Sequence, residues 1–208
     1  MIVDNTEQIK KLIDNCGPGE FYMINIIHRK KDGRSIYNID RLGPTHIVTS
    51  FYITSIKELD DKMAEIKDLC KLFNARAYIN INKKNWKKTT LNAIETISSS
   101  LIQEKVNKYW YEPLKYLLNE PFCGRSEKGS NLWFFDVDTK DMTIFENIKT
   151  LFNNTELGSD KIIDVIQTVN GYHIFTKPFD LKLFRELYTE HISVCANRPT
   201  LLYANINN

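Results

Sequence analysis

Leu132-Trp133-Phe134-Phe135-Asp136-Val137-Asp138 is an apolar run that ends in two carboxylates one residue apart. The run predicts a β-strand, on which side chains at positions i and i+2 project to the same face. Asp136 and Asp138 would then lie side by side where the strand ends. Two carboxylates that close repel each other, and a hard cation such as Mg²⁺ or Mn²⁺ relieves the repulsion. The alternative is an acidic strand end in a solvated turn.

The residues that follow this strand predict an antiparallel sheet with helices on one face. After it we expect a helix with Met142, Phe145, Ile148 and Phe152 facing inward, strands at 161–168 and 172–176, a helix from Asp180 to about Thr189, and a final strand around Thr200 to Ala204. This β-α-β-β-α-β order is typical of ferredoxin-like and RNA-recognition-type (RRM-like) domains. The second half, residues 132–208, therefore indicates an α+β fold.

The residues before this strand predict an N-terminal α/β lobe, residues 1–118, that packs against the second half in a single domain. We expect a helix at 5–15 that ends at Gly17, strands at 20–28 and 46–54, a helix capped by Ser55, a strand at 76–82 and a helical region from about 90 to 118. Residues 119–131 contain Pro121, Gly124 and Gly129, and predict a loop between the halves.

Composition places the chain among globular proteins and excludes several classes. The 208 residues are 42% hydrophobic, 26% charged and 12% aromatic, so the chain can bury one good core. We see no apolar stretch long enough to span a membrane and no signal peptide at the N-terminus, so we expect a cytosolic protein. Cys16, Cys70, Cys123 and Cys195 are scattered, which favours buried thiols over a zinc site or disulfides.

Positive charge gathers in two segments. The first is Arg29-Lys30-Lys31-Asp32-Gly33-Arg34, in which Asp-Gly between extended flanks predicts a hairpin tip that carries cations. The second is Lys83-Lys84-Asn85-Trp86-Lys87-Lys88. Lysines around a tryptophan suit a nucleic-acid backbone and a stacked base, although a solvated loop with an incidental tryptophan fits the pattern equally well.

A second motif surrounds His173, in Gln167-Thr168-Val169-Asn170-Gly171-Tyr172-His173-Ile174-Phe175. Asn170-Gly171 predicts a type I′ turn with positive φ. Tyr172 and Ile174 flank His173, so the imidazole faces away from both. If the 132–138 strand is its neighbour, His173 and the two carboxylates share one open face. In isolation such a residue is more often an ordinary sheet histidine.

Together these motifs resemble the archaeo-eukaryotic primase superfamily of primase-polymerases, especially its compact phage members. The resemblance runs from about Arg76 to Tyr203, and more faintly through the N-terminal lobe. In that superfamily an apolar strand ending in D-x-D binds catalytic metals, and a small-residue turn leads to a histidine that holds the incoming nucleotide's phosphates. Trp133–Asp138 and Asn170–His173 match these motifs, and Tyr78–Lys84 matches an upstream strand that ends in asparagine and basic residues.

The resemblance implies a metal-dependent nucleotidyltransferase, a DNA-directed primase or polymerase of phage- or plasmid-type DNA replication. Its catalytic Mg²⁺ or Mn²⁺ would sit on Asp136 and Asp138, and its substrates would be nucleoside triphosphates and a single-stranded DNA template. The sequence does not distinguish ribonucleotides from deoxyribonucleotides. No P-loop is present, so unwinding would need a separate helicase. A phage-encoded member would act in the host cytosol. The implied contacts are His173, Asn170, Lys83 and Lys84 for the nucleotide, and Trp86, Lys87, Lys88, Arg29, Lys30 and Lys31 for nucleic acid.

One departure separates this chain from the superfamily. A third motif places another metal-binding acid some two dozen residues after the histidine, but here Asn197 stands at about that position. An amide oxygen can still contact a metal, and Asp164 or Asp180 could substitute, although Asp180 fits a helix cap. One alternative is therefore a nucleic-acid-binding replication protein with weakened catalysis. A phosphatase of the haloacid dehalogenase type ranks last, because Thr139-Lys140 replaces the expected Gly-Thr.

Overall fold

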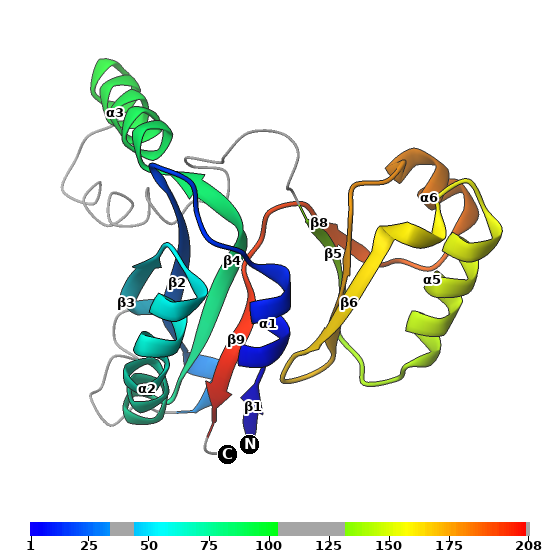
Figure 1. Cartoon of the computed structure of the whole chain (residues 1–208), viewed down its shortest axis with the longest axis horizontal. Coiled ribbons are helices and arrows are strands. Elements are labelled where there is room, and N and C mark those ends of the chain that lie inside the picture. The colour runs from blue at the N-terminus through cyan, green and yellow to red at the C-terminus, as the bar shows by residue number, and fades with distance from the viewer. Residues whose placement is uncertain (34–43, 104–131, 207–208) are drawn as a thin grey trace.

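Two antiparallel sheets, each with its own helices, lie side by side (Figure 1). The computed structural model describes residues 1–33, 44–103 and 132–206. The α+β class predicted from the sequence is confirmed. The helices are α1 (Thr6–Leu12), α2 (Ile56–Phe73), α3 (Trp86–Ile102), α5 (Thr143–Asn154) and α6 (Leu181–Leu187), with short 3₁₀ turns at Lys30–Asp32 and Ser159–Lys161.

The strands divide between the two sheets. The first sheet has the order β1-β9-β4-β2-β3, and the second has the order β6-β7-β5-β8. Their bounds are β1 (Ile2–Asp4), β2 (Glu20–Arg29), β3 (Thr45–Ile53), β4 (Ala75–Asn85), β5 (Trp133–Val137), β6 (Ile162–Gln167), β7 (Tyr172–Thr176), β8 (Ser193–Cys195) and β9 (Thr200–Asn205). We call the part built on the first sheet the first lobe and the part built on the second sheet the second lobe.

Helix α2 covers one face of the first sheet. Its N-cap is Ser55, whose hydroxyl accepts a hydrogen bond from the Glu58 amide, and it ends at Asn74 in the left-handed conformation. The helix buries Leu59, Met63, Ile66 and Cys70 against alternate residues of β2 and β4. Helix α2 does not cover the opposite face of β4. This face carries Arg76, Tyr78 and a row of polar side chains, which can take part in binding or catalysis.

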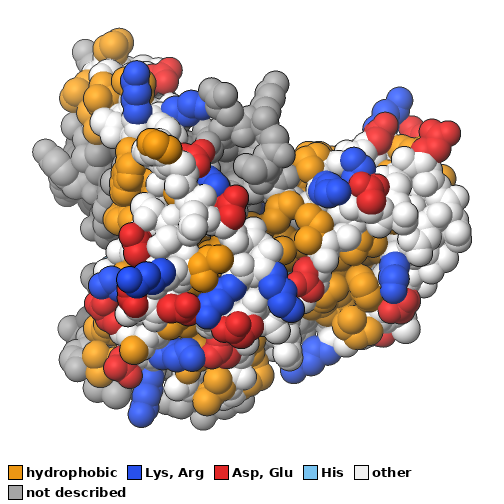
Figure 2. Space-filling view, in the orientation of Figure 1, with side chains coloured by type: hydrophobic (Ala, Val, Ile, Leu, Met, Phe, Trp, Pro, Cys, Tyr) orange, Lys and Arg blue, Asp and Glu red, His pale blue; other side chains and the backbone are white. Residues whose placement is uncertain are grey.

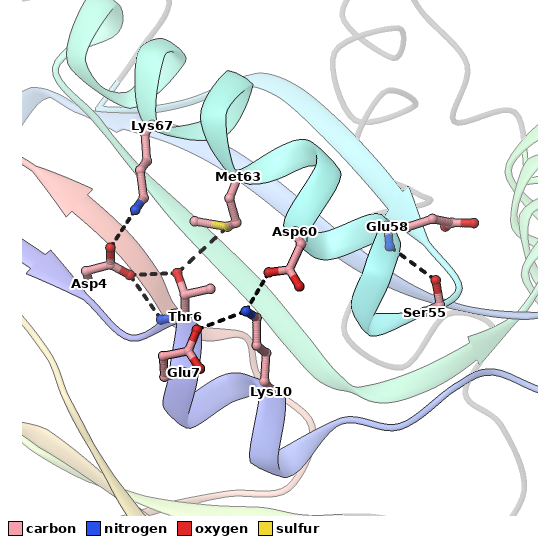
Figure 3. Close-up of polar contacts among 9 residues, drawn as sticks. All are labelled: Asp4, Thr6, Glu7, Lys10, Ser55, Glu58, Asp60, Met63 and Lys67. Carbon is pink, nitrogen blue, oxygen red and sulfur yellow. Dashed lines mark hydrogen bonds and ion pairs between the residues drawn. The ribbon is translucent and has the colours of Figure 1, made fainter.

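Helix α1 is attached to α2 by burial more than by charge. Figure 3 shows Lys10 between Glu7 and Asp60, and Asp4 between Lys67 and Thr6. Exposed ion pairs of this kind add little to stability, because water screens them. Full burial of Ile9 contributes about 1.5–3 kcal/mol, so the apolar contact dominates.

The elements of the second lobe follow one another in the order β5, α5, β6, β7, α6, β8. Helices α5 and α6 lie on its outer side, away from the first lobe (Figure 1). Side chains alternate along β5: Phe135 and Val137 pack under the helices with Ile148 and Phe152, whereas Phe134 packs toward the first lobe. This alternation places Phe134, Asp136 and Asp138 on the face opposite the helices.

The expected final strand of the second half is wrong. Thr200–Asn205 forms β9, which crosses back to pair with β1 and β4 of the first sheet, and Ser193–Cys195 forms the fourth strand of the second sheet instead. The stretch 200–204 is buried almost throughout, so its apolar pattern fitted a strand in either sheet. Strand β1 was not predicted.

Two predicted turns differ in detail. Neither Asn170 nor Gly171 has positive φ. The β6–β7 pairing ends at Gln167 and Tyr172, so a four-residue connection replaces the type I′ turn. At the other site Lys30–Asp32 forms a 3₁₀ turn, and β3 begins only at Thr45, so Asp32-Gly33 is not a hairpin tip. Arg34, Cys123, the loop 119–131 and the predicted helix beyond 103 lie outside the described residues.

Candidate active site

A cleft of about 540 Å³ lies between the two sheets. It is lined by residues of β2, β4, β5, β7, the β6–β7 connection and the segment that leads into β9: Ile27, Arg29, Lys31, Thr45, Arg76, Tyr78, Phe134, Asp136, Asp138, Thr168, Asn170, His173, Arg198, Pro199 and Leu201. Asp136, Asp138 and His173, predicted from separate motifs, thus meet in one cleft.

Asp136 and His173 are direct neighbours across the β5–β7 ladder. Nε2 of His173 lies 3.2 Å from Oδ1 of Asp136. This hydrogen bond is the largest influence that holds the pKa of Asp136 below its ordinary value, and Arg198 adds to it, while partial burial opposes both. The Asp136 carboxylate is therefore ionised near neutral pH, and it can bind a cation or accept a hydrogen bond.

The imidazole of His173 is held in place on two further sides. Its ring stacks on Phe134, with centroids 4.1 Å apart and an interplanar angle of 17°. Its Nδ1 lies 2.8 Å from the hydroxyl of Thr200, a fully buried residue of β9. Because the Asp136 carboxylate can only accept, Nε2 carries hydrogen, and in the neutral ring Nδ1 accepts from Thr200. His173 is therefore oriented as an Nε2–H donor at the cleft.

Gly171 brings the β6–β7 connection against the end of β5. A Cβ atom at this position would lie 1.9 Å from the Val137 carbonyl oxygen and 2.8 Å from the Thr139 nitrogen. Glycine is required here for close approach and not for positive φ. The contact brings the connection to the end of β5 near the two carboxylates, and Asn170 lines the same cleft as Asp136 and Asp138.

The same connection joins the two lobes. The Asn5 amide donates to the carbonyl oxygens of Gln167 and Leu201. Val169 packs on a small apolar cluster of the first lobe that contains Val3 and Leu201. These contacts fix the two walls of the cleft relative to each other.

Four basic residues line the cleft: Arg29, Lys31, Arg76 and Arg198. Arg29 donates to the Tyr78 hydroxyl. Arg76 is almost fully buried and makes a bidentate pair with Asp32, whose carboxylate accepts from Nε and Nη2. By contrast, cations and anions are interspersed over the face that contains α1 and α2 (Figure 2). The excess of positive charge in the cleft suits an anionic ligand.

Asn197, the predicted substitute for the third acid, does not line the cleft. It is buried, and its Oδ1 accepts a hydrogen bond from Asn82. Asn82 also pairs with both backbone groups of Leu132. Asn197 therefore helps to hold the start of β5. The position of Asn197 does not support the predicted role in metal binding, which stays a prediction.

The other candidates for a third acid lie elsewhere. Asp180 caps α6, and its Oδ1 accepts from the amides of Lys182 and Leu183. Asp164 lies on β6, where its Oδ1 accepts from the Val165 amide. Within residues 1–33, 44–103 and 132–206, no group of three or more His, Cys, Asp or Glu residues could hold a metal ion.

Lys83 and Lys84 are not brought to the cleft. Lys83 forms an ion pair of 2.6 Å with Asp14 and donates to the Asn15 carbonyl oxygen. Lys84 is 1% exposed. Both residues lie near the end of β4 that is remote from Arg76, so the strand carries them away from Asp136. The cleft cations are Arg29, Lys31, Arg76 and Arg198 instead.

Trp86 forms a separate aromatic cluster. Its ring stacks on Phe21 at 3.7 Å and lies 5.2 Å from Tyr52. Nine residues of β4 lie between Arg76 and Trp86, a span of roughly 30 Å at about 3.3 Å per residue. Lys87 and Lys88 follow in the first turn of α3. A nucleic-acid contact here remains a prediction. Lys30 lies closer to the cleft, in a shallow hollow that also contains Arg29 and Lys31.

Reasoning from the sequence missed the cleft residues Arg76 and Arg198, and also Thr200, which contacts His173 from behind the cleft wall. Arg76 shares its face of β4 with Tyr78, so the period-two pattern contained a signal for it. Arg198 follows Asn197 directly. Thr200 belongs to the other sheet, and no local pattern indicates its contact with His173.

Comparison of the chain with protein-family models, curated proteins and solved structures finds no match. In addition, none of the helices in the described ranges is long and apolar enough to cross a membrane.

Proposed function

We propose that this protein is a metal-dependent nucleotidyltransferase that acts as a primase or template-directed polymerase in DNA replication. The observation that carries the proposal is the meeting of Asp136, Asp138 and His173 in a cleft lined by four basic residues. Each motif alone is weak, but their convergence from separate parts of the chain supports a site for a nucleoside triphosphate.

The donor set fits a Mg²⁺ or Mn²⁺ ion that is shared with substrate. Asp136 and Asp138 offer two carboxylates on one face, and Mg²⁺ is usually bound by one or two carboxylates with substrate phosphates and waters. A bound divalent ion would lower the pKa of the attacking hydroxyl and balance the charge of the triphosphate. With few protein ligands in the cleft, we expect metal affinity to be weak until the nucleotide is present.

The remaining residues position the substrate. His173 would donate from Nε2 to a phosphate oxygen, which requires the Asp136 carboxylate to release this hydrogen bond. Arg198 and Lys31 are exposed and would neutralise phosphate charge, whereas Arg76 is held by Asp32 as a fixed wall. The substrates would be nucleoside triphosphates and a single-stranded DNA template, and a separate helicase would supply unwinding.

One observation favours a second candidate, a nucleic-acid-binding replication protein with weakened catalysis. Asn197 stands where the third acid is expected, and its side chain is engaged by Asn82. If Asp136 and Asp138 do not suffice for catalysis, the cleft would retain phosphate and strand binding only.

Three assays on the full chain separate these functions. The first measures incorporation of labelled nucleotides on a single-stranded template with Mn²⁺, with and without a primer. The second measures binding of single-stranded DNA across a salt series, and the third measures phosphatase activity. Metal-dependent, template-dependent incorporation supports the proposal. Salt-sensitive binding without incorporation supports the second candidate, and phosphate release alone contradicts both.

A further inference from the structure

A second hollow of about 650 Å³ opens beside the cleft. Its wall includes Lys31, Arg76 and Asn170, which also line the cleft, so the two spaces meet at these three residues. Lys140 lines only the second hollow. The hollow therefore continues the cleft past the two carboxylates and does not form an isolated pocket.

The charge of this hollow is positive. Lys31 and Lys140 are exposed, and neither has an ion-pair partner within the described ranges. Arg76 also lies in the wall, and Asp32, the one carboxylate among the described residues that line the hollow, is already neutralised by the bidentate pair with Arg76. Two unpaired lysines that face one open space attract an anion, and the anion can bind without breaking an existing ion pair.

The position of Lys140 relates the hollow to the reacting centre. Lys140 follows Asp138 by two residues, which limits their Cα separation to roughly 7 Å. Gly171 fixes the neighbouring Asn170 against the same end of β5. An anion in the hollow would thus lie next to, and not within, the space in the cleft that one nucleotide would occupy beside Asp136 and His173.

We propose that the second hollow binds a backbone phosphate of single-stranded nucleic acid, adjacent to the nucleotide in the cleft. The strand passes from the cleft over Lys31 to Lys140. This inference rests on the proposed function for the class of ligand, but it concerns strand binding and does not require catalysis.

The test measures binding without turnover. A fluorescent oligothymidylate of about 12 nucleotides is titrated with the full chain, without divalent metal, over a series of salt concentrations. The variants are Lys140→Ala and Lys140→Glu. The matched control is Lys182→Ala, because Lys182 is an exposed lysine on α6, on the outer side of the same lobe.

Lys140→Ala is expected to weaken binding severalfold and to reduce the slope of log K against log salt by about 0.7, the loss of one phosphate contact on a single strand. Lys140→Glu weakens binding further, and Lys182→Ala matches the wild type. Binding of a single nucleoside triphosphate, measured by calorimetry, is unchanged in Lys140→Ala.

Three results overturn the inference: wild-type protein that does not bind the oligonucleotide, a Lys140→Ala slope equal to that of the control, or an equal loss of mononucleotide and oligonucleotide affinity. Failure of the proposed function has a different signature. The wild type would then bind the strand with the expected dependence on Lys140 but would incorporate no nucleotide.

Discussion

The hydroxyl of Thr200 lies 2.8 Å from Nδ1 of His173, so a buried residue of the first lobe orients the histidine of the second. His173 in turn reaches Asp136. The chain Thr200–His173–Asp136 therefore couples the packing of the two lobes to the geometry of the cleft. If the lobes separated, the imidazole would lose the hydroxyl that holds its Nδ1 atom.

Thr200→Val should disturb this arrangement, because valine has the shape of threonine but no hydroxyl. Nδ1 of His173 would be left unsatisfied in a buried site, at a cost of about 1–3 kcal/mol in the free energy of unfolding. The ¹⁵N shift of Nδ1 in His173 would report the lost hydrogen bond, and nucleotide affinity would fall. Thr200→Ser keeps the hydroxyl and should restore both. Unchanged His173 shifts in Thr200→Val would show that Thr200 does not position the ring.

Gly171→Ala should destabilise the protein, since the new Cβ would overlap the Val137 carbonyl oxygen. We expect a loss of about 1–3 kcal/mol in denaturant unfolding, together with reduced activity of the folded fraction, because the strand that carries Asp136 must shift. Gly17→Ala is the matched control: its nearest neighbour is the flexible Glu20 side chain, so its effect should stay within about 0.5 kcal/mol. Equal effects for the two variants would contradict the required close approach at Gly171.

Asp32→Asn should cost far more than the loss of an ordinary ion pair. Asp32 and Arg76 are both buried, and removal of one partner leaves an uncompensated charge, which typically costs about 3–5 kcal/mol. Asp160→Asn removes a pair with Lys177 in which both side chains are exposed, and its cost should be much smaller. Thermal unfolding of the two variants measures both losses of stability. A small effect of Asp32→Asn would mean that Arg76 has another partner.

The pair between Lys83 and Asp14 predicts a modest dependence of stability on pH. The hydrogen bond from Lys83 is the largest influence that lowers the pKa of Asp14. A carboxyl pKa that is lowered in the folded state stabilises the fold at pH values above the unfolded-state pKa, which is near 4. This contribution is lost as the pH falls through the folded-state pKa. Asp14→Asn should thus cost less than about 1 kcal/mol near neutral pH, because Asp14 is largely exposed, and nothing in strong acid. A difference that persists in acid would contradict this origin.

Much of the fold could be predicted because its patterns are local. Ser55 begins α2 as a side-chain cap, and the alternation along β5 separates the residues under the helices from those at the cleft. The placement of β9 could not be predicted, because a strand buried on both faces pairs equally well with either sheet. The connection at Gly171 was recognised as tight, but for the wrong reason, since sequence does not separate a need for positive φ from a need for space.

The candidate site was predictable where it depended on spacing within one strand. Asp136 and Asp138 share a face by the geometry of β5, and His173 faces away from Tyr172 and Ile174 for the same reason. Lys83 was misplaced because proximity in sequence to an aromatic and basic segment says nothing about which end of β4 meets the other lobe. Contacts between lobes, such as those of Arg198 and Thr200, depend on tertiary packing.

Nucleotide incorporation by Asp138→Asn tests the central claim most directly. The wild type and the variant are compared on a primed single-stranded template with Mn²⁺, after thermal unfolding has established that both are folded. Asp164→Asn serves as the control, because Asp164 does not line the cleft. We predict that Asp138→Asn lowers the incorporation rate at least about a hundredfold while Asp164→Asn retains the wild-type rate. Wild-type incorporation by Asp138→Asn would contradict the account.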